Sequence, residues 1–296
     1  MKHSLTLLTL LGLSLAACGQ DDVVAAPYDA GDASPVAVDV SPDAQATTSG
    51  VAINHSMNRL AAGRTGRTPA YNDITLEIAS VDALTAGSAA VLGTTALNTS
   101  ACSAMGGCAW SVAGVELSGA TLGLAARLRD NRTASALWVT TATGFAGPAD
   151  VNTAGTTGLY GNGRAFAVSR DAIDTVIAPL VGLTGDEVMA RGFIFGLIYN
   201  RYEGGAGDGS GTPVVGAAVS ASVPSMRIVY PNNMFSGTVG STASQGAFLA
   251  VPDAPGGALA VRFLVTPPRG ESLSWDATRV TVSAPGLVYF TPMYAR

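Results

Sequence analysis

The chain has 296 residues, of which 21 are acidic, 16 are basic and 36 are glycines, and its formal net charge is −5. One of the 16 basic residues is Lys2, so the rest of the chain carries fifteen arginines and no lysine. A chain with so few cations offers no basic surface to nucleic acid or to an anionic membrane, and we exclude nucleic acid as a partner.

Residues 1–17 have the features of a secretory signal peptide. Lys2 supplies a positive charge, and an apolar run from Leu5 to Ala17 ends in small residues. The run is shorter than the roughly 20 residues that a helix needs to span a bilayer. We therefore expect this segment to be removed on export.

The four residues Leu15-Ala16-Ala17-Cys18 end the apolar run. They resemble the lipobox of bacterial lipoproteins, which implies cleavage before Cys18 and acylation of its thiol. In that family an aspartate directly after the cysteine retains the protein in the inner membrane, whereas Gly19 follows here. The resemblance therefore implies a lipid anchor in the outer membrane, on its periplasmic or cell-surface side.

Residues 18–50 are predicted to form an acidic, disordered tether. The part from 21 to 50 contains six aspartates, three prolines and no basic residue. Chains of this composition bury too little apolar surface to offset the entropy of ordering. From Val51 onward the fifteen remaining acids balance the fifteen arginines.

The body is predicted to be mainly β, with two antiparallel β-sandwich domains at residues 51–168 and 193–296 and a short helical connector at 169–192. Ile74, Leu76 and Ile78 alternate with Thr75 and Glu77, which is the period of a half-buried strand. Short strands separated by turn residues favour sandwiches over alternating βα units. Similar runs recur at residues 110–115, 120–127, 137–141, 193–199, 214–220, 226–230, 247–251, 258–265, 279–282 and 287–291.

The connector is predicted to contain two short helices. Helical spacing relates Ile173, Val176, Ile177 and Leu180, with Asp171 as a candidate cap, Pro179 as a candidate bend and Gly182 as a terminator. Thr184 followed by Glu187 matches a capping box that would begin a second helix ending at Gly192.

Two cysteines remain after Cys18, in the stretch CSAMGGC at 102–108. In an exported protein we expect Cys102 and Cys108 to form a disulfide bond. A zinc site is the alternative, but it needs further cysteine or histidine ligands, and His55 is the body's one histidine.

Three stretches of the second half carry a resemblance to a known family: GLIY at 196–199, TPVVGAAV at 212–219 and TASQGAFLAV at 242–251. They resemble carboxypeptidase-regulatory-like domains, which are transthyretin-like sandwiches. The resemblance implies that the turn at Pro213 leads into a core strand, and that Gly246 forms a tight hairpin whose Phe248 fills the core. The insertion at 203–211 and the stretch from 219 to 242 depart from the family. Residues 69–110 show a weaker resemblance to the same family, which would make residues 51–168 a diverged first copy of the second sandwich.

The sequence contains little that indicates catalysis. It lacks a Gly-x-Ser-x-Gly motif, and we expect His55 to be a surface or loop residue, so a serine or cysteine hydrolase of the triad type is disfavoured. A glycosidase with paired carboxylates stays open, because sequence does not show which acids face each other. The oxygens of Glu203 and Asp208 are suited to calcium, but the EF-hand spacing is absent, so we favour a plain flexible loop there and keep a calcium site as the alternative.

We therefore expect an outer-membrane lipoprotein without a cofactor and without enzymatic activity, whose body is a binding or structural module. Its partners would be the membrane, through the lipid anchor, and a protein or glycan. A surface hydrolase acting on glycans through carboxylates is one alternative. A calcium-stabilised adhesion or assembly module is the other.

Overall fold

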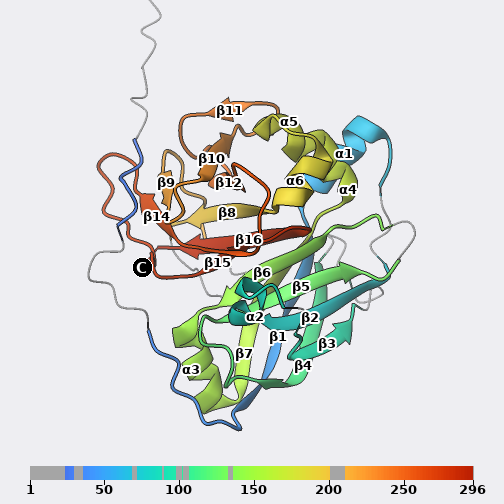
Figure 1. Cartoon of the computed structure of the whole chain (residues 1–296), viewed down its shortest axis with the longest axis vertical. Coiled ribbons are helices and arrows are strands. Elements are labelled where there is room, and N and C mark those ends of the chain that lie inside the picture. The colour runs from blue at the N-terminus through green and yellow to red at the C-terminus, as the bar shows by residue number, and fades with distance from the viewer. Residues whose placement is uncertain are drawn as a thin grey trace, which may run out of the picture.

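A computed structural model describes residues 24–29, 36–68, 72–88, 90–97, 102, 107–132, 136–200 and 211–295. Its largest element is a nine-stranded sheet with the order β11-β10-β12-β8-β16-β6-β5-β2-β3 (Figure 1). The bounds of these strands, in that order, are Thr238–Val239, Met226–Pro231, Ala247–Pro252, Phe193–Tyr199, Leu287–Tyr294, Thr140–Ala146, Leu124–Asp130, Ile74–Ser80 and Gly93–Ala96.

The strand β16 lies in the middle of this sheet and pairs in parallel with both β8 and β6. Its neighbours come from the two halves of the chain, so strands of both predicted sandwiches share one sheet. The mainly β class is confirmed, whereas two separate antiparallel sandwiches are not. The physical reason is that Leu287 to Met293 are all buried, and a strand apolar on both faces is satisfied in the centre of a sheet rather than at its edge.

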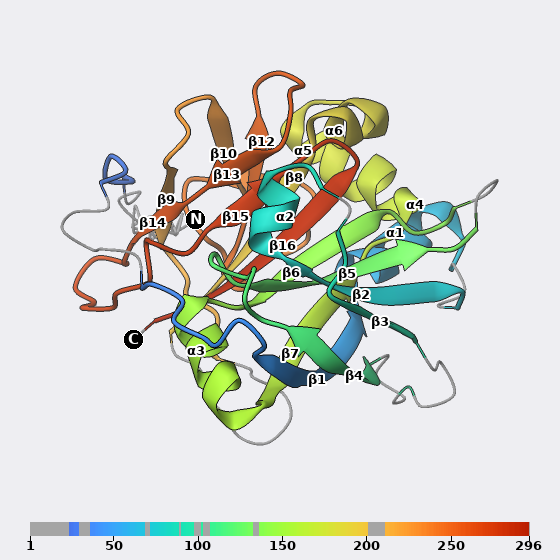
Figure 2. The same ribbon diagram turned by 60° about the horizontal axis from the view of Figure 1, so that its bottom comes forward.

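A second sheet of three strands, β4-β1-β7, packs against the β2 and β5 end of the large sheet (Figure 2). Its strands are β1 (Gln45–Asn54), β4 (Gly107–Glu116) and β7 (Leu159–Ala167). The strand β1 pairs in parallel with β7 and places Gly50 against Gly163, where a Cβ on Gly50 would lie 1.8 Å from the Gly163 carbonyl oxygen. Residues 45–50 of the predicted tether thus belong to a strand.

The rest of the described tether, residues 24–29 and 36–44, also contacts the body, and we call these two stretches the N-terminal strap. Val38, Val40 and Ala44 pack against the core that the second sheet covers. These stretches of the predicted tether thus have contacts with the body, which the composition of the segment does not predict.

Helices cover the same face of the large sheet at its other end, around β8 and β16. They are α1 (Ser56–Thr65), α4 (Arg170–Ala172), a π-helical turn (Ile173–Ile177), α5 (Ala178–Val181) and α6 (Gly185–Arg191). The opposite face is covered by α2 (Val81–Thr85) and by the pairs β9 (Ala218–Ala221) with β14 (Phe263–Thr266) and β13 (Leu259–Val261) with β15 (Thr281–Ser283). The helix α3 (Pro148–Thr157) lies beside β7 and β1.

The predicted local signals of the connector are present. Gly182 ends α5 in the left-handed conformation, with φ at 63°, and Thr184 and Glu187 form the capping box of α6. Ser169, not Asp171, caps the first helix, and a π-helical turn precedes Pro179. The segment packs on the large sheet, so its role as a link between two domains is not confirmed.

The predicted disulfide between Cys102 and Cys108 is confirmed by a sulfur–sulfur distance of 1.96 Å. Cys108 lies in β4 and is fully buried against the core that the second sheet covers. The bridge therefore links Cys102 to the second residue of β4, which pairs with Ala52 of β1.

We predict that replacing both cysteines, Cys102→Ser with Cys108→Ser, lowers the free energy of unfolding by about 2 kcal/mol, because the bridge removes loop-closure entropy from the unfolded chain. Urea unfolding with and without a thiol reductant measures this difference. The reductant should bring the wild type to the level of the double variant and leave the variant unchanged. Equal stability of the oxidised wild type and the variant would contradict the prediction.

Candidate binding cleft

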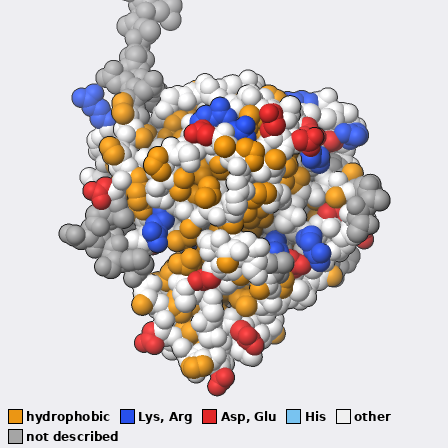
Figure 3. Space-filling model, viewed as in Figure 1, with side chains coloured by type: hydrophobic (Ala, Val, Ile, Leu, Met, Phe, Trp, Pro, Cys, Tyr) orange, Lys and Arg blue, Asp and Glu red, His pale blue; other side chains and the backbone are white. Residues whose placement is uncertain are grey.

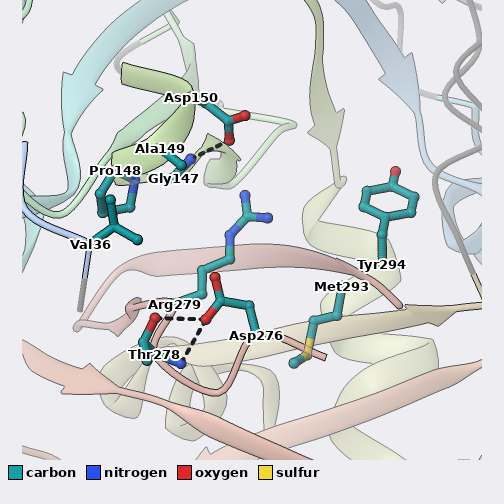
Figure 4. A pocket seen from close by; sticks show the side chains of 10 residues that line it. All are labelled: Val36, Gly147, Pro148, Ala149, Asp150, Asp276, Thr278, Arg279, Met293 and Tyr294. Atoms are coloured by element: carbon teal, nitrogen blue, oxygen red, sulfur yellow. Dashed lines mark hydrogen bonds between the residues drawn. The ribbon is translucent and has the colours of Figure 1, made fainter. Parts of the chain in front are cut away.

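A cavity of about 200 Å³ lies where the two halves of the chain meet. One wall is the start of α3, and the other is the segment before β15 together with the end of β16 (Figure 4). Its lining residues are Val36, Gly147, Pro148, Ala149, Asp150, Asp276, Thr278, Arg279, Met293 and Tyr294. We call this cavity the cleft.

Arg279 is the cation of the cleft. Its guanidinium donates to the backbone oxygens of Gly144, at 2.6 Å, and of Pro292, at 3.4 Å. A guanidinium carries five N–H donors, so these two bonds leave others for a ligand. In Figure 4 the guanidinium lies between Asp150 and Asp276, which come from the two halves of the chain.

Both carboxylates also hold the local backbone. Asp150 accepts from the Gly147 N–H at 2.8 Å and so completes the start of α3, where Gly147 has no side chain to cap the helix. Asp276 accepts from the Thr278 N–H at 3.0 Å and from the Thr278 hydroxyl at 2.6 Å. Each carboxylate is fixed in place by a turn of its own segment.

The tyrosines near the cleft are poor candidates for a catalytic base. Tyr289 lies behind Gly144, where a Cβ would come within 2.4 Å of the phenol oxygen. Burial raises the pKa of Tyr289 to about 12, although nearby Arg279 lowers it. Burial also raises the pKa of Tyr199, which stacks on Tyr294 with ring centroids 5.2 Å apart. These phenols therefore stay protonated at neutral pH.

A second cavity, of about 350 Å³, lies between α2 and the turn that leads into β16. The face of the molecule shown in Figure 3 has hydrophobic side chains across its middle, with charged side chains mostly towards its edges. Arg127 lines this cavity, but its Nε lies 2.6 Å from a carboxylate oxygen of buried Glu77, which Arg129 also contacts at 3.2 Å. Because its cation is paired with a buried acid, this cavity offers a ligand less polar recognition than the cleft does.

His55 lies in the loop between β1 and α1, as one half of the expectation had it, but it is buried rather than at the surface. Its ring lies 5.0 to 5.6 Å, between centroids, from those of Phe166, Phe195 and Phe290. Its Nδ1 accepts from the Met57 N–H at 3.2 Å and caps α1. Desolvation lowers the pKa of His55 to about 4, so the imidazole is neutral at neutral pH, and its ring neighbours in the described part of the chain are phenylalanines.

The remaining predicted site residues lie outside the described part of the chain. These are Cys18, the predicted lipidation site, and the stretch with Glu203 and Asp208, the predicted calcium loop. Among the residues that the structure describes, no cluster of three or more metal-ligating side chains occurs. No described helix is long and apolar enough to cross a membrane.

Sequence reasoning missed the three charged residues of the cleft. Gly147-Pro148 followed by Asp150 is a recognisable helix start, with proline in the first turn and an acid in the third position. The helix α3 was therefore predictable from the sequence. No sequence signal places Asp276 and Arg279 opposite that helix, because their meeting depends on the pairing of β16 with β6.

Comparison with protein-family models gave no match, and comparison with curated proteins gave none.

We predict that protonation of His55 destabilises the fold below neutral pH. The folded pKa of about 4 lies below the unfolded value of 6.5, so the unfolded chain binds the extra proton. The stabilisation is complete above pH 6.5 and is lost as the pH falls towards 4, by about 3 kcal/mol at about 1.4 kcal/mol per pKa unit.

The matched variant for this measurement is His55→Asn, which keeps a helix-capping acceptor and does not titrate. Urea unfolding between pH 4 and pH 7 should show a steeper loss of stability for the wild type than for the variant. The chain's other histidine, His3, lies in the predicted signal peptide, so the difference isolates His55. Parallel pH profiles of the two proteins would contradict the prediction.

Proposed function

We propose that this protein is an exported lipoprotein, anchored in the outer membrane through Cys18, whose folded part is a non-catalytic module that binds a sugar unit of a glycan in the cleft. The observation that carries the binding proposal is the position of the Arg279 guanidinium between the Asp150 and Asp276 carboxylates. The sequence Leu15-Ala16-Ala17-Cys18 supports the anchor.

The charges of the cleft favour a neutral ligand that both donates and accepts hydrogen bonds. Two carboxylates repel an anion, and the guanidinium repels a cation. A sugar hydroxyl donates to a carboxylate and accepts from a guanidinium, so adjacent hydroxyls satisfy both kinds of group at once. Met293 and Pro148 add apolar surface for the faces of a sugar ring. The lining combines apolar side chains with a few polar groups, which is the usual composition of small-molecule sites.

The same carboxylates favour one alternative, a glycan hydrolase. Such an enzyme needs one carboxyl group that delivers a proton and a second that acts as base or nucleophile. Asp150 and Asp276 both face the cleft, yet each accepts hydrogen bonds from its own backbone turn. Groups held in this way suit ligand positioning, so binding without turnover is the function we favour.

We predict that Cys18→Ser releases the protein from the membrane or leaves the precursor uncleaved, because several acyl chains on one cysteine provide firm anchoring whereas the body has no basic surface. Fractionation followed by a salt wash, with detection of the chain by antibody, measures this. The double variant Cys102→Ser with Cys108→Ser is the control, because it removes the two other cysteines together and leaves the lipobox intact. Retention of the Cys18→Ser chain in washed outer membrane would contradict the anchor.

We predict that the mature chain binds neutral oligosaccharides on a glycan array, and that Arg279→Met weakens this binding about tenfold or more, as expected for the loss of charged hydrogen bonds. Arg227→Met is the matched control, because the Arg227 guanidinium also donates to a backbone oxygen, that of Val181, and does not line the cleft.

The same protein should show no turnover of glycan, ester or peptide substrates above a heat-denatured sample. Turnover that is abolished by Asp150→Asn or Asp276→Asn would replace the binding module with the hydrolase. Absence of any glycan binding would contradict the proposed ligand.

A further inference from the structure

The first stretch of the N-terminal strap contacts the second half of the chain. The Ala26 N–H donates to the Thr266 hydroxyl at 3.1 Å, and the Tyr28 hydroxyl donates to the Ala277 carbonyl at 3.1 Å. Tyr28 is half-buried against the body, and this burial raises the pKa of its phenol, while Arg262 lowers it. Figure 1 shows this stretch beside the loop that follows β14.

The second stretch of the strap is held by α3. The Asp39 N–H donates to Asn152 Oδ1 at 2.7 Å, and the Asn152 side-chain amide donates to the Ala37 carbonyl at 2.9 Å. Val40 packs against Gly155, where a Cβ would lie 2.5 Å from a Val40 methyl group. The two stretches of the strap therefore lie on one side of the molecule, one beside the loop after β14 and the other beside α3 (Figure 1).

The number of residues between Cys18 and the strap limits how far the body can lie from the lipid. Ala26, the first residue of the strap with a described contact to the body, is eight positions after Cys18. Eight fully extended residues span about 29 Å at most, taking roughly 3.3–3.6 Å each. The point at which the strap first meets the body is thus confined to within about 29 Å of the bilayer surface.

The corner of the body at that point has a surface suited to lipid headgroups. Val24 is 85% exposed, and Val215 is 49% exposed. Gly216, next to Val215, packs against Pro268, and Arg269 beside Pro268 is exposed. Exposed apolar side chains next to a cation fit the boundary between headgroups and acyl chains. We call Val24, Val215, Pro268 and Arg269 the corner surface.

We propose that the corner surface faces and contacts the phospholipid bilayer to which Cys18 is anchored. This inference rests on the proposed lipidation of Cys18. Glu271 is also exposed near Arg269, so the corner surface is too weakly basic to hold the protein by itself. The lipid provides the attachment, and the corner surface sets the orientation, with α3 directed away from the membrane.

The test uses the mature lipidated chain in vesicles of phosphatidylethanolamine and phosphatidylglycerol that contain a headgroup-labelled quencher lipid. A fluorophore is attached to Val215→Cys in the corner surface or, as the matched control, to Leu159→Cys. Leu159 is also an exposed apolar residue, at 64%, and it begins β7 beside α3 at the opposite end of Figure 1.

Only protein that floats with the vesicles is measured, so the anchor and the orientation are tested separately. We expect a large loss of fluorescence from the Val215 label and little loss from the Leu159 label. Arg269→Glu should reduce the loss at Val215, because a carboxylate is repelled by phosphatidylglycerol. Equal quenching at both positions, or stronger quenching at Leu159, would overturn the proposed orientation. Failure of the chain to float would instead refute the lipid anchor.

Discussion

The parallel pairing of β16 with both β6 and β8 is the interaction on which the rest of the structure depends. The strand is the last element of the chain, and it joins strands from the two halves into one sheet. Val288 and Phe290 pack towards the helices, whereas Tyr289 and Met293 pack towards the opposite core. Because the strand contributes to cores on both faces, neither half can bury its apolar surface without it.

The cleft is a consequence of this pairing. Arg279 precedes β15, and its guanidinium reaches Gly144 at the end of β6. Gly144 is required there, because any side chain would collide with Tyr289 of β16. The cation is therefore brought opposite α3 only when β16 and β6 are joined, so ligand binding in the cleft would report directly on the integrity of the central sheet.

The sequence predicted the features that depend on nearby residues. The strand β8 has the predicted bounds of 193–199, the disulfide has the predicted partners, and the capping box of α6 is formed by Thr184 and Glu187. Each of these depends on patterns within a few residues. The partner of a strand is a different matter, because the run at 287–291 looks the same whether its neighbours are parallel or antiparallel.

The contacts of the N-terminal strap are not evident from the composition of its sequence, but they are consistent with its spacing. Val36, Val38 and Val40 alternate in the aspartate-containing segment before β1, and the last two of them pack against the body. This alternation has the period of a β-strand, although the acidic composition of the same stretch indicates disorder. The three charged residues of the cleft had no such signal, since their proximity follows from the order of strands.

The strap links the proposed anchor to the proposed binding site. Its first stretch meets the body at Thr266, and its second stretch begins with Val36, which lines the cleft. The cleft therefore lies along the same side of the molecule as the path from the lipid to α3. A short connection to the membrane would leave this side facing across the membrane surface rather than away from it. Because Val36 of the strap lines the cleft, a ligand bound there also contacts the segment that leads to the proposed anchor.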